Sequence, residues 1–126
     1  MKRIITLLCI ICIVAQVYAW KPLFAGHRGS YRGVENTEEA FMNGINHYGY
    51  TGLEIDVKTT NDGEYVCWHD DDLSRVGHEG VSIPNSKWAD IKDLTLTQTR
   101  SGNTYTGKLC SVDRYLEICK ENNVFP

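Results

Sequence analysis

The stretch Gly52-Leu53-Glu54-Ile55-Asp56-Val57-Lys58 decides the fold class of this chain. Apolar and charged residues alternate along it, which is the period-two pattern of a β-strand. Alternation places Glu54 and Asp56 on one face, about 7 Å apart. Two like charges on one face favour a cation between them, and oxygen ligands suit a hard divalent ion. The alternative is a solvent-facing strand with hydrated acids, partly neutralised by Lys58.

Residues 1–19 have the composition of a secretory signal peptide. Two cations precede an apolar run over residues 4–14, and small residues near Ala19 suit a cleavage site. The run is shorter than the about 20 residues of a membrane-spanning helix. We predict that residues 20–126 form an exported domain, periplasmic or extracellular and without stable membrane insertion. An uncleaved N-terminal anchor is the alternative.

The charge balance argues against two classes of partner. The sequence has 13 Lys and Arg against 16 Asp and Glu, a net charge of −3. Cleavage of the signal peptide would remove two more cations, and no basic stripe remains. Nucleic-acid binding and electrostatic docking on an anionic membrane are therefore not expected.

Three cysteines follow the signal peptide: Cys67, Cys110 and Cys119. An exported protein can form disulfides, but the number is odd and the spacing fits no zinc motif. Cys67 lies in an apolar strand and Cys119 on the apolar face of a helix, so we expect buried free thiols at both. The state of Cys110 stays open.

The chain alternates between strand and helix patterns. We expect a buried strand at 23–26, a helix from the N-cap Asn36 to Gly49, strands at 53–57 and 64–69, a loop at 70–83, a short helix at 84–91, a helix capped by Ser111, and the start of a strand at 124–126. Residues 94–109 show no assignable pattern. Strands that alternate with helices predict βαβ units and a parallel sheet, which is an α/β fold.

Polar residues stand at or near the C-terminal ends of the predicted strands. His27 follows the first, Glu54 and Asp56 lie on the second, and His69 ends the third. In parallel α/β folds this edge of the sheet is where active sites are built. Two histidines around an acidic pair favour general acid–base chemistry beside a metal ion.

Arg28 stands directly after His27. Its planar guanidinium matches the geometry of phosphate oxygens. The alternative is a surface arginine that pairs with Glu35.

Several motifs follow one another at close spacing between residues 23 and 75. They are His27-Arg28-Gly29, Glu35-Asn36-Thr37 with Ala40 and Phe41, Leu53 to Val57, then Thr60, Asp62-Gly63, Val66 and His69-Asp70 with Leu73 and Arg75. Together they resemble the N-terminal signature of the glycerophosphodiester phosphodiesterase family, with a weaker similarity at 111–121.

The resemblance implies a TIM (β/α)8 barrel that hydrolyses glycerophosphodiesters to glycerol 3-phosphate and an alcohol such as choline, ethanolamine or glycerol. By similarity, His27 and His69 are the acid–base pair, Glu54 and Asp56 bind one Ca²⁺ or Mg²⁺, and Arg28 contacts the phosphate. This chemistry is consistent, because a phosphodiester needs charge neutralisation, a deprotonated nucleophile and a protonated leaving group.

The length of the chain departs from that pattern. A TIM barrel needs about 250 residues and eight strands, whereas this sequence has 126 residues and about three strands. We therefore expect an incomplete barrel, an N-terminal fragment that is inactive alone. The third metal ligand, a glutamate, is expected on a strand after Pro126.

Two other functions remain as alternatives. One is a phospholipase-type phosphodiesterase on the same barrel, although the loop at 70–83 carries no apolar cluster to meet a lipid. The other is a secreted module that binds a phosphodiester headgroup without catalysis. Binding alone does not need two histidines.

Overall fold

The structure, a computed structural model, describes residues 22–126. The strands are β1 (Ala25–His27), β2 (Gly52–Glu54), β3 (Val57–Thr59), β4 (Tyr65–Cys67), β5 (Asp72–Leu73), β6 (His78–Ser82), β7 (Leu96–Arg100), β8 (Asn103–Gly107) and β9 (Cys110–Ser111). The helices are α2 (Glu38–Tyr48), α3 (Trp88–Ile91) and α4 (Val112–Asn122), with 3₁₀ turns at Ser74–Val76 and Ile83–Asn85. The predicted signal peptide lies outside the described residues. Among those described, no helix is long and apolar enough to cross a bilayer.

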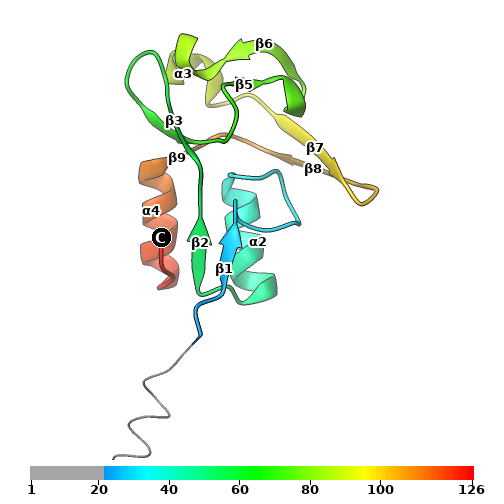
Figure 1. Ribbon diagram of the computed structural model, residues 1–126, viewed down its shortest axis with the longest axis vertical. Coiled ribbons are helices and arrows are strands. Elements are labelled where there is room, and N and C mark those ends of the chain that lie inside the picture. The colour runs from blue at the N-terminus through cyan, green and yellow to red at the C-terminus, as the bar shows by residue number, and fades with distance from the viewer. Residues whose placement is uncertain (1–21) are drawn as a thin grey trace, which may run out of the picture.

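Two units make up the described chain (Figure 1). The parallel unit consists of β1, α2, β2 and α4, with β1 and β2 side by side and in parallel. The antiparallel unit spans residues 57–111 and contains the sheet β3–β4–β9, the pair β5–β6, the hairpin β7–β8 and α3. The expected parallel sheet is therefore present only in the first unit.

The stretch 52–58, which opened the sequence analysis, is divided between the two units. Its strand ends at Glu54, and β3 starts at Val57 with an antiparallel partner, β4. The prediction of one strand over 53–57 was wrong. The reason is a change of partner: Leu53 bonds to the chain end near Phe125, whereas the Asp56 carbonyl accepts a hydrogen bond from the Trp68 backbone N–H at 3.0 Å.

The strand expected at 124–126 is confirmed in outline. Phe125 forms a parallel bridge with Gly52, and its backbone N–H bonds to the Thr51 carbonyl at 2.9 Å. The strand before His69 is different, because β4 pairs antiparallel with both β3 and β9. His69 therefore does not end a strand of the parallel sheet, contrary to the expectation.

Helix α2 begins and ends with identifiable caps. The N-cap is Thr37 and not Asn36, because Thr37 Oγ1 accepts the Ala40 N–H at 3.4 Å. The prediction at the other end is confirmed, since Gly49 adopts the left-handed φ of 65° that favours glycine. The predicted cap at Ser111 of α4 is also confirmed, with its hydroxyl oxygen 3.2 Å from the Arg114 N–H.

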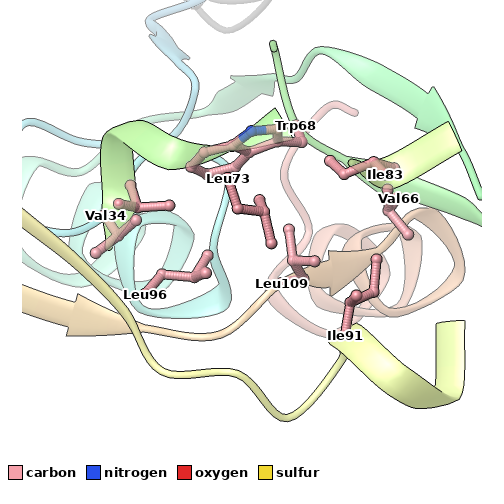
Figure 2. Packing of buried hydrophobic residues seen from close by; sticks show 9 residues of the cluster. Val34, Val66, Trp68, Leu73, Ile83, Ile91, Leu96 and Leu109 are labelled. Carbon is pink, nitrogen blue, oxygen red and sulfur yellow. The ribbon is translucent and has the colours of Figure 1, made fainter. Parts of the chain in front are cut away.

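Two hydrophobic clusters support the units. One cluster combines Val34, from the loop before α2, with residues of the antiparallel unit: Val66, Trp68, Leu73, Val76, Ile83, Ile91, Leu96 and Leu109, most of which Figure 2 labels. The other cluster combines Phe41, Leu53, Tyr115, Ile118 and Cys119 of the parallel unit with Cys67 of β4 and Cys110 of β9, so it packs the two units together. All three cysteines after the signal peptide are buried free thiols, as expected for Cys67 and Cys119.

Other expectations were wrong at the edges of these cores. Leu23 and Phe24 are each 59% exposed rather than part of a buried strand, because the described chain pairs β1 only with β2. Residues 70–83 form β5, a 3₁₀ turn and β6 rather than a loop. Residues 94–109, which had no assignable pattern, contain the β7–β8 hairpin.

Candidate active site

The loop after β1 carries His27 and Arg28 and packs closely against α2. Arg28 and Gly29 both have left-handed φ angles, 54° and 89°. A Cβ at Gly29 would lie 2.9 Å from the Ala40 backbone carbon, so only glycine fits there. The Arg28 carbonyl accepts the Asn36 N–H at 3.0 Å, which closes the loop. The backbone beneath His27 and Arg28 is thus fixed by local geometry.

Parallel pairing brings His27 and Glu54 together. The two residues are register partners in β1 and β2, and His27 Nε2 lies 3.9 Å from Glu54 Oε2. The same carboxylate oxygen accepts the Arg28 backbone N–H at 2.9 Å. Both side chains remain accessible, with exposed fractions of 76% for His27 and 46% for Glu54. The expectation that these two residues share one edge of the sheet is confirmed.

Asp56 reaches the same place by another route. It lies beyond the end of β2, and its Oδ2 is 2.8 Å from Arg28 Nε and 3.0 Å from Asn36 Nδ2. Its backbone N–H donates to Asn36 Oδ1 at 3.2 Å. The Asn36 side chain therefore holds Asp56 through both backbone and carboxylate. Lys58, the neutralising partner considered from the sequence, instead pairs with Asp71 at 2.6 Å.

Glu35 is the centre of an arginine cluster. Its carboxylate accepts hydrogen bonds from Arg28 Nη1 at 3.0 Å, Arg75 Nη2 at 2.7 Å and Arg100 Nη2 at 2.6 Å. Burial opposes the charged form of Glu35, but the hydrogen bonds and charges of Arg75 and Arg28 outweigh it and lower the pKa from 4.5 to about 2. The pairing of Arg28 with Glu35, considered from the sequence, is thus present, alongside the contact with Asp56.

His69 joins this cluster through its neighbour. Its Nδ1 lies 2.6 Å from Asp70 Oδ1, and Asp70 Oδ2 accepts from Arg75 Nε at 2.7 Å. The hydrogen bond from His69 and then that from Arg75 lower the pKa of Asp70, against the effect of burial. A continuous path of polar contacts therefore connects His69 through Asp70, Arg75 and Glu35 to the Arg28 loop.

A pocket of about 510 Å³ opens beside the Arg28 loop. Its lining consists of His27, Arg28, Gly29, Tyr31, Glu35, Tyr50 and Arg100. Glu54, Asp56 and His69 do not line this pocket, although the contacts above tie them to residues that do. The pocket thus places one histidine beside two guanidinium groups.

Two carboxylates near the Arg28 loop, those of Glu54 and Asp56, have oxygen atoms suited to bind a hard cation. Within residues 22–126, Glu54 Oε1 and Asp56 Oδ1 take no hydrogen bond, since each carboxylate bonds through its other oxygen. Carboxylate oxygens are the ligands that Ca²⁺ and Mg²⁺ prefer. The described residues contain no group of three His, Cys, Asp or Glu side chains placed to hold a metal. The free oxygens of the two carboxylates thus fit part of the coordination sphere of a hard cation, and the described residues hold no third such ligand.

Several site residues had no role in the sequence analysis. Arg75 and Asp70 stood in the motifs without an assigned contact, and Asn36 was taken for a helix cap. Arg100 carried no signal at all, because its contact with Glu35 spans 65 residues of sequence. The signal for Asn36 was its place between Glu35 and Thr37, where a left-handed φ of 58° turns the chain.

Comparison with known proteins bears directly on this arrangement. Residues 26–125 match the model of the Glycerophosphoryl diester phosphodiesterase family. The chain belongs to this family. The match begins just before His27 and ends at Phe125, so it includes the loop, both carboxylates, the arginine cluster and His69.

Individual members of the family are also similar to this chain in sequence and in structure. A glycerophosphodiester phosphodiesterase of Caldanaerobacter subterraneus is 35% identical over 82 residues, which cover 64% of this chain and 30% of that protein. The solved structure of a glycerophosphoryl diester phosphodiesterase from Parabacteroides distasonis matches with a TM-score of 0.67 at 28% identity. The match covers 80% of this chain and 35% of the Parabacteroides chain. The glycerophosphodiester phosphodiesterase from Thermotoga maritima matches with a TM-score of 0.59 at 33% identity. This match covers 82% of this chain and 40% of the Thermotoga chain. The chain thus spans between 30% and 40% of the length of these relatives.

Proposed function

We propose that the complete protein containing this chain is a metal-dependent hydrolase that converts glycerophosphodiesters to glycerol 3-phosphate and an alcohol. The observation that carries the proposal is the cluster of His27, Arg28, Glu54 and Asp56 on one loop and one strand end, within the region that matches the family. The parallel β1–β2 pair and the bridge to Phe125 support its placement in a TIM barrel.

The acid–base chemistry is assigned to the two histidines. Asp70 orients the His69 ring through Nδ1, which leaves Nε2 as the atom that exchanges a proton with substrate. Nε2 of His27, 3.9 Å from Glu54 Oε2, is the proton-exchanging atom of the second histidine. One imidazole takes the proton of the attacking hydroxyl and the other returns a proton to the departing alkoxide, so protons balance over the step.

The attacking hydroxyl is proposed to belong to the glycerol of the substrate itself. Its attack on phosphorus breaks the bond to the alcohol and leaves a cyclic phosphate, which water then opens to glycerol 3-phosphate. Arg28 stabilises the non-bridging oxygens of phosphate with a fixed positive charge. Glu54 and Asp56 would hold one Ca²⁺ or Mg²⁺, which supplies further neutralisation of the phosphate charge.

The test uses the complete gene product that contains this sequence, purified with its metal. Incubation with glycerophosphodiesters should release glycerol 3-phosphate, a chelator should abolish the release, and Ca²⁺ or Mg²⁺ should restore it. Absence of turnover with every diester, despite binding by calorimetry, would instead favour a headgroup-binding module. Turnover unaffected by the chelator would contradict the metal requirement alone.

Export is proposed separately, from residues 1–19. Expression of the complete protein with those residues should give a secreted or periplasmic product whose N-terminus, by mass spectrometry, is Trp20. A cytoplasmic product with an intact N-terminus would contradict the proposal.

A further inference from the structure

A second groove adjoins the candidate active site. It has a volume of about 350 Å³, and its lining includes Tyr31, Arg32, Tyr48, Arg100 and Asn103. Tyr31 and Arg100 also line the pocket beside His27, so the two hollows share a wall. A molecule bound at His27 can therefore extend into this groove, which we call the hairpin groove.

The wall between the hollows is built by long-range contacts. The β7–β8 hairpin turns at Ser101 and Gly102, whose positive φ angles of 48° and 79° suit a tight two-residue turn. Ser101 Oγ lies 3.2 Å from the Tyr31 hydroxyl oxygen, and the Arg100 guanidinium lies 5.3 Å from the Tyr31 ring centroid. The hairpin, which projects from the antiparallel unit in Figure 1, is thus attached to the loop before α2.

The charges of the hairpin groove have one sign. Arg32 and Arg100 line it, and among the described residues no carboxylate does. Arg100 is paired with Glu35, but that carboxylate also holds Arg28 and Arg75. Arg32 is exposed, and its backbone N–H and carbonyl both bond to Ser30 Oγ at 3.2 Å, which fixes the loop beneath it. A cationic group would meet two guanidinium groups here.

The tyrosines of the groove do not offset this charge. A quaternary ammonium group is recognised by open aromatic faces. One face of Tyr31 is already covered by the Arg100 guanidinium, and Tyr48 stacks on Tyr50 with ring centroids 5.5 Å apart. Tyr105, the third tyrosine of the groove, is half-buried and packs against the cluster that includes Leu96 and Leu109. The available groups are instead guanidinium donors, the Asn103 amide and phenolic hydroxyls, which suit hydroxyl oxygens.

We infer that the hairpin groove binds the leaving alcohol of the substrate and selects a hydroxyl-rich alcohol without positive charge, of the glycerol or inositol class, over choline. This inference rests on the proposed function and adds a specificity determinant, Arg32 with Arg100, that lies outside the predicted acid–base and metal-binding residues.

The experiment compares three diesters on the complete, metal-loaded protein: glycerophosphoinositol, glycerophosphoglycerol and glycerophosphocholine. We expect kcat/KM for the two polyol diesters to exceed that for the choline diester by about tenfold. Arg32→Gln should bring that ratio several-fold closer to one, through a higher KM for the polyol diesters with kcat nearly unchanged. Lys120→Gln, which removes an exposed cation from α4, is the matched control and should leave the ratio as it was.

Two results would overturn the inference. One is equal kcat/KM for all three diesters in the wild type, and the other is an Arg32→Gln ratio equal to that of the Lys120→Gln control. If no diester is turned over, the proposed function fails by itself. Calorimetry of glycerophosphoinositol and glycerophosphocholine against the same protein then tests the groove directly, and equal dissociation constants would overturn it. Arg100→Gln is a secondary variant, because it also breaks the contact with Glu35.

Discussion

The two units of the molecule contribute to the candidate site in different ways. The parallel unit presents His27 and Glu54 by strand pairing, because β1 and β2 align these two residues in register. The antiparallel unit presents His69 and its arginines through side-chain contacts that span up to 65 residues of sequence. Glu35, between β1 and α2, accepts from the arginines of both. The candidate site therefore lies at the interface of the two units, and its geometry depends on the packing of one unit against the other.

The largest effect is expected from the histidines, one from each unit. His27→Ala and His69→Ala should each lower kcat of the complete enzyme by roughly 100-fold or more, because each removes one of the two proposed proton-transfer groups. The measurement is steady-state release of glycerol 3-phosphate from a glycerophosphodiester. Similar losses in both variants would show that the two units contribute equally to the chemistry.

His47→Ala is the matched control for this pair. His47 is exposed near the end of α2 and lines neither of the two hollows. Its removal should leave kcat within about twofold of the wild-type value, as expected of a surface substitution. Near-normal turnover in either the His27 or the His69 variant would remove that residue from the mechanism.

The next effect concerns the connection between the units. Glu35→Gln should lower the free energy of unfolding by about 3 kcal/mol at neutral pH, because three guanidinium groups lose their shared carboxylate. The side chain of Glu35 is only 6% exposed, so solvent screens these interactions little. Urea unfolding of variant and wild type measures the difference. Glu79→Gln, an exposed acid on β6, should change the value by less than about 0.5 kcal/mol.

The same residue predicts a pH dependence. Folding lowers the pKa of Glu35 from 4.5 to about 2, so its contribution to stability is complete above about pH 4.5. It is lost as the pH falls from there towards 2, because the unfolded chain takes up a proton in this range while the folded protein keeps Glu35 ionised. The wild type should lose stability more steeply than Glu35→Gln in this range. Parallel curves for the two proteins would contradict the role given to Glu35.

The sequence predicted the parallel unit better than the antiparallel one, for a physical reason. Helices α2 and α4 follow from local patterns of apolar residues and from the caps at Gly49 and Ser111. The His27–Glu54 neighbourhood was accessible because strand ends of a parallel sheet meet at one edge. His69 was expected at that edge too, but the strand before it, β4, pairs with antiparallel partners that no periodicity identifies.

Polar contacts between distant residues account for most of what the sequence did not reveal. The hairpin β7–β8 is rich in Thr, Asn and Gly, and its pattern is weak because much of it is exposed. Arg100 becomes part of the site only through the position of that hairpin. Asn36 was assigned to the helix cap because Asn and Thr are both good caps, and only the contact with Asp56 distinguishes the two.

The smallest effect separates these two neighbours, Asn36 and Thr37. Thr37→Ala removes the cap of α2 and should lower the free energy of unfolding by about 1 kcal/mol, with kcat nearly unchanged. Asn36→Ala removes both hydrogen bonds to Asp56, so it should raise the metal concentration needed for half-maximal activity by about tenfold or more. Thermal unfolding and a metal titration of activity measure the two quantities.

The Asn36→Ala variant also alters the backbone, since its φ of 58° disfavours alanine. Asn36→Gly separates the two causes, because glycine accepts this φ but still lacks the amide. If the hydrogen bonds to Asp56 matter for the metal site, Asn36→Gly should recover stability while the metal requirement stays raised. Recovery of both properties in the glycine variant would mean that Asn36 shapes only the turn, and the link between this residue and Asp56 chemistry would have to be abandoned.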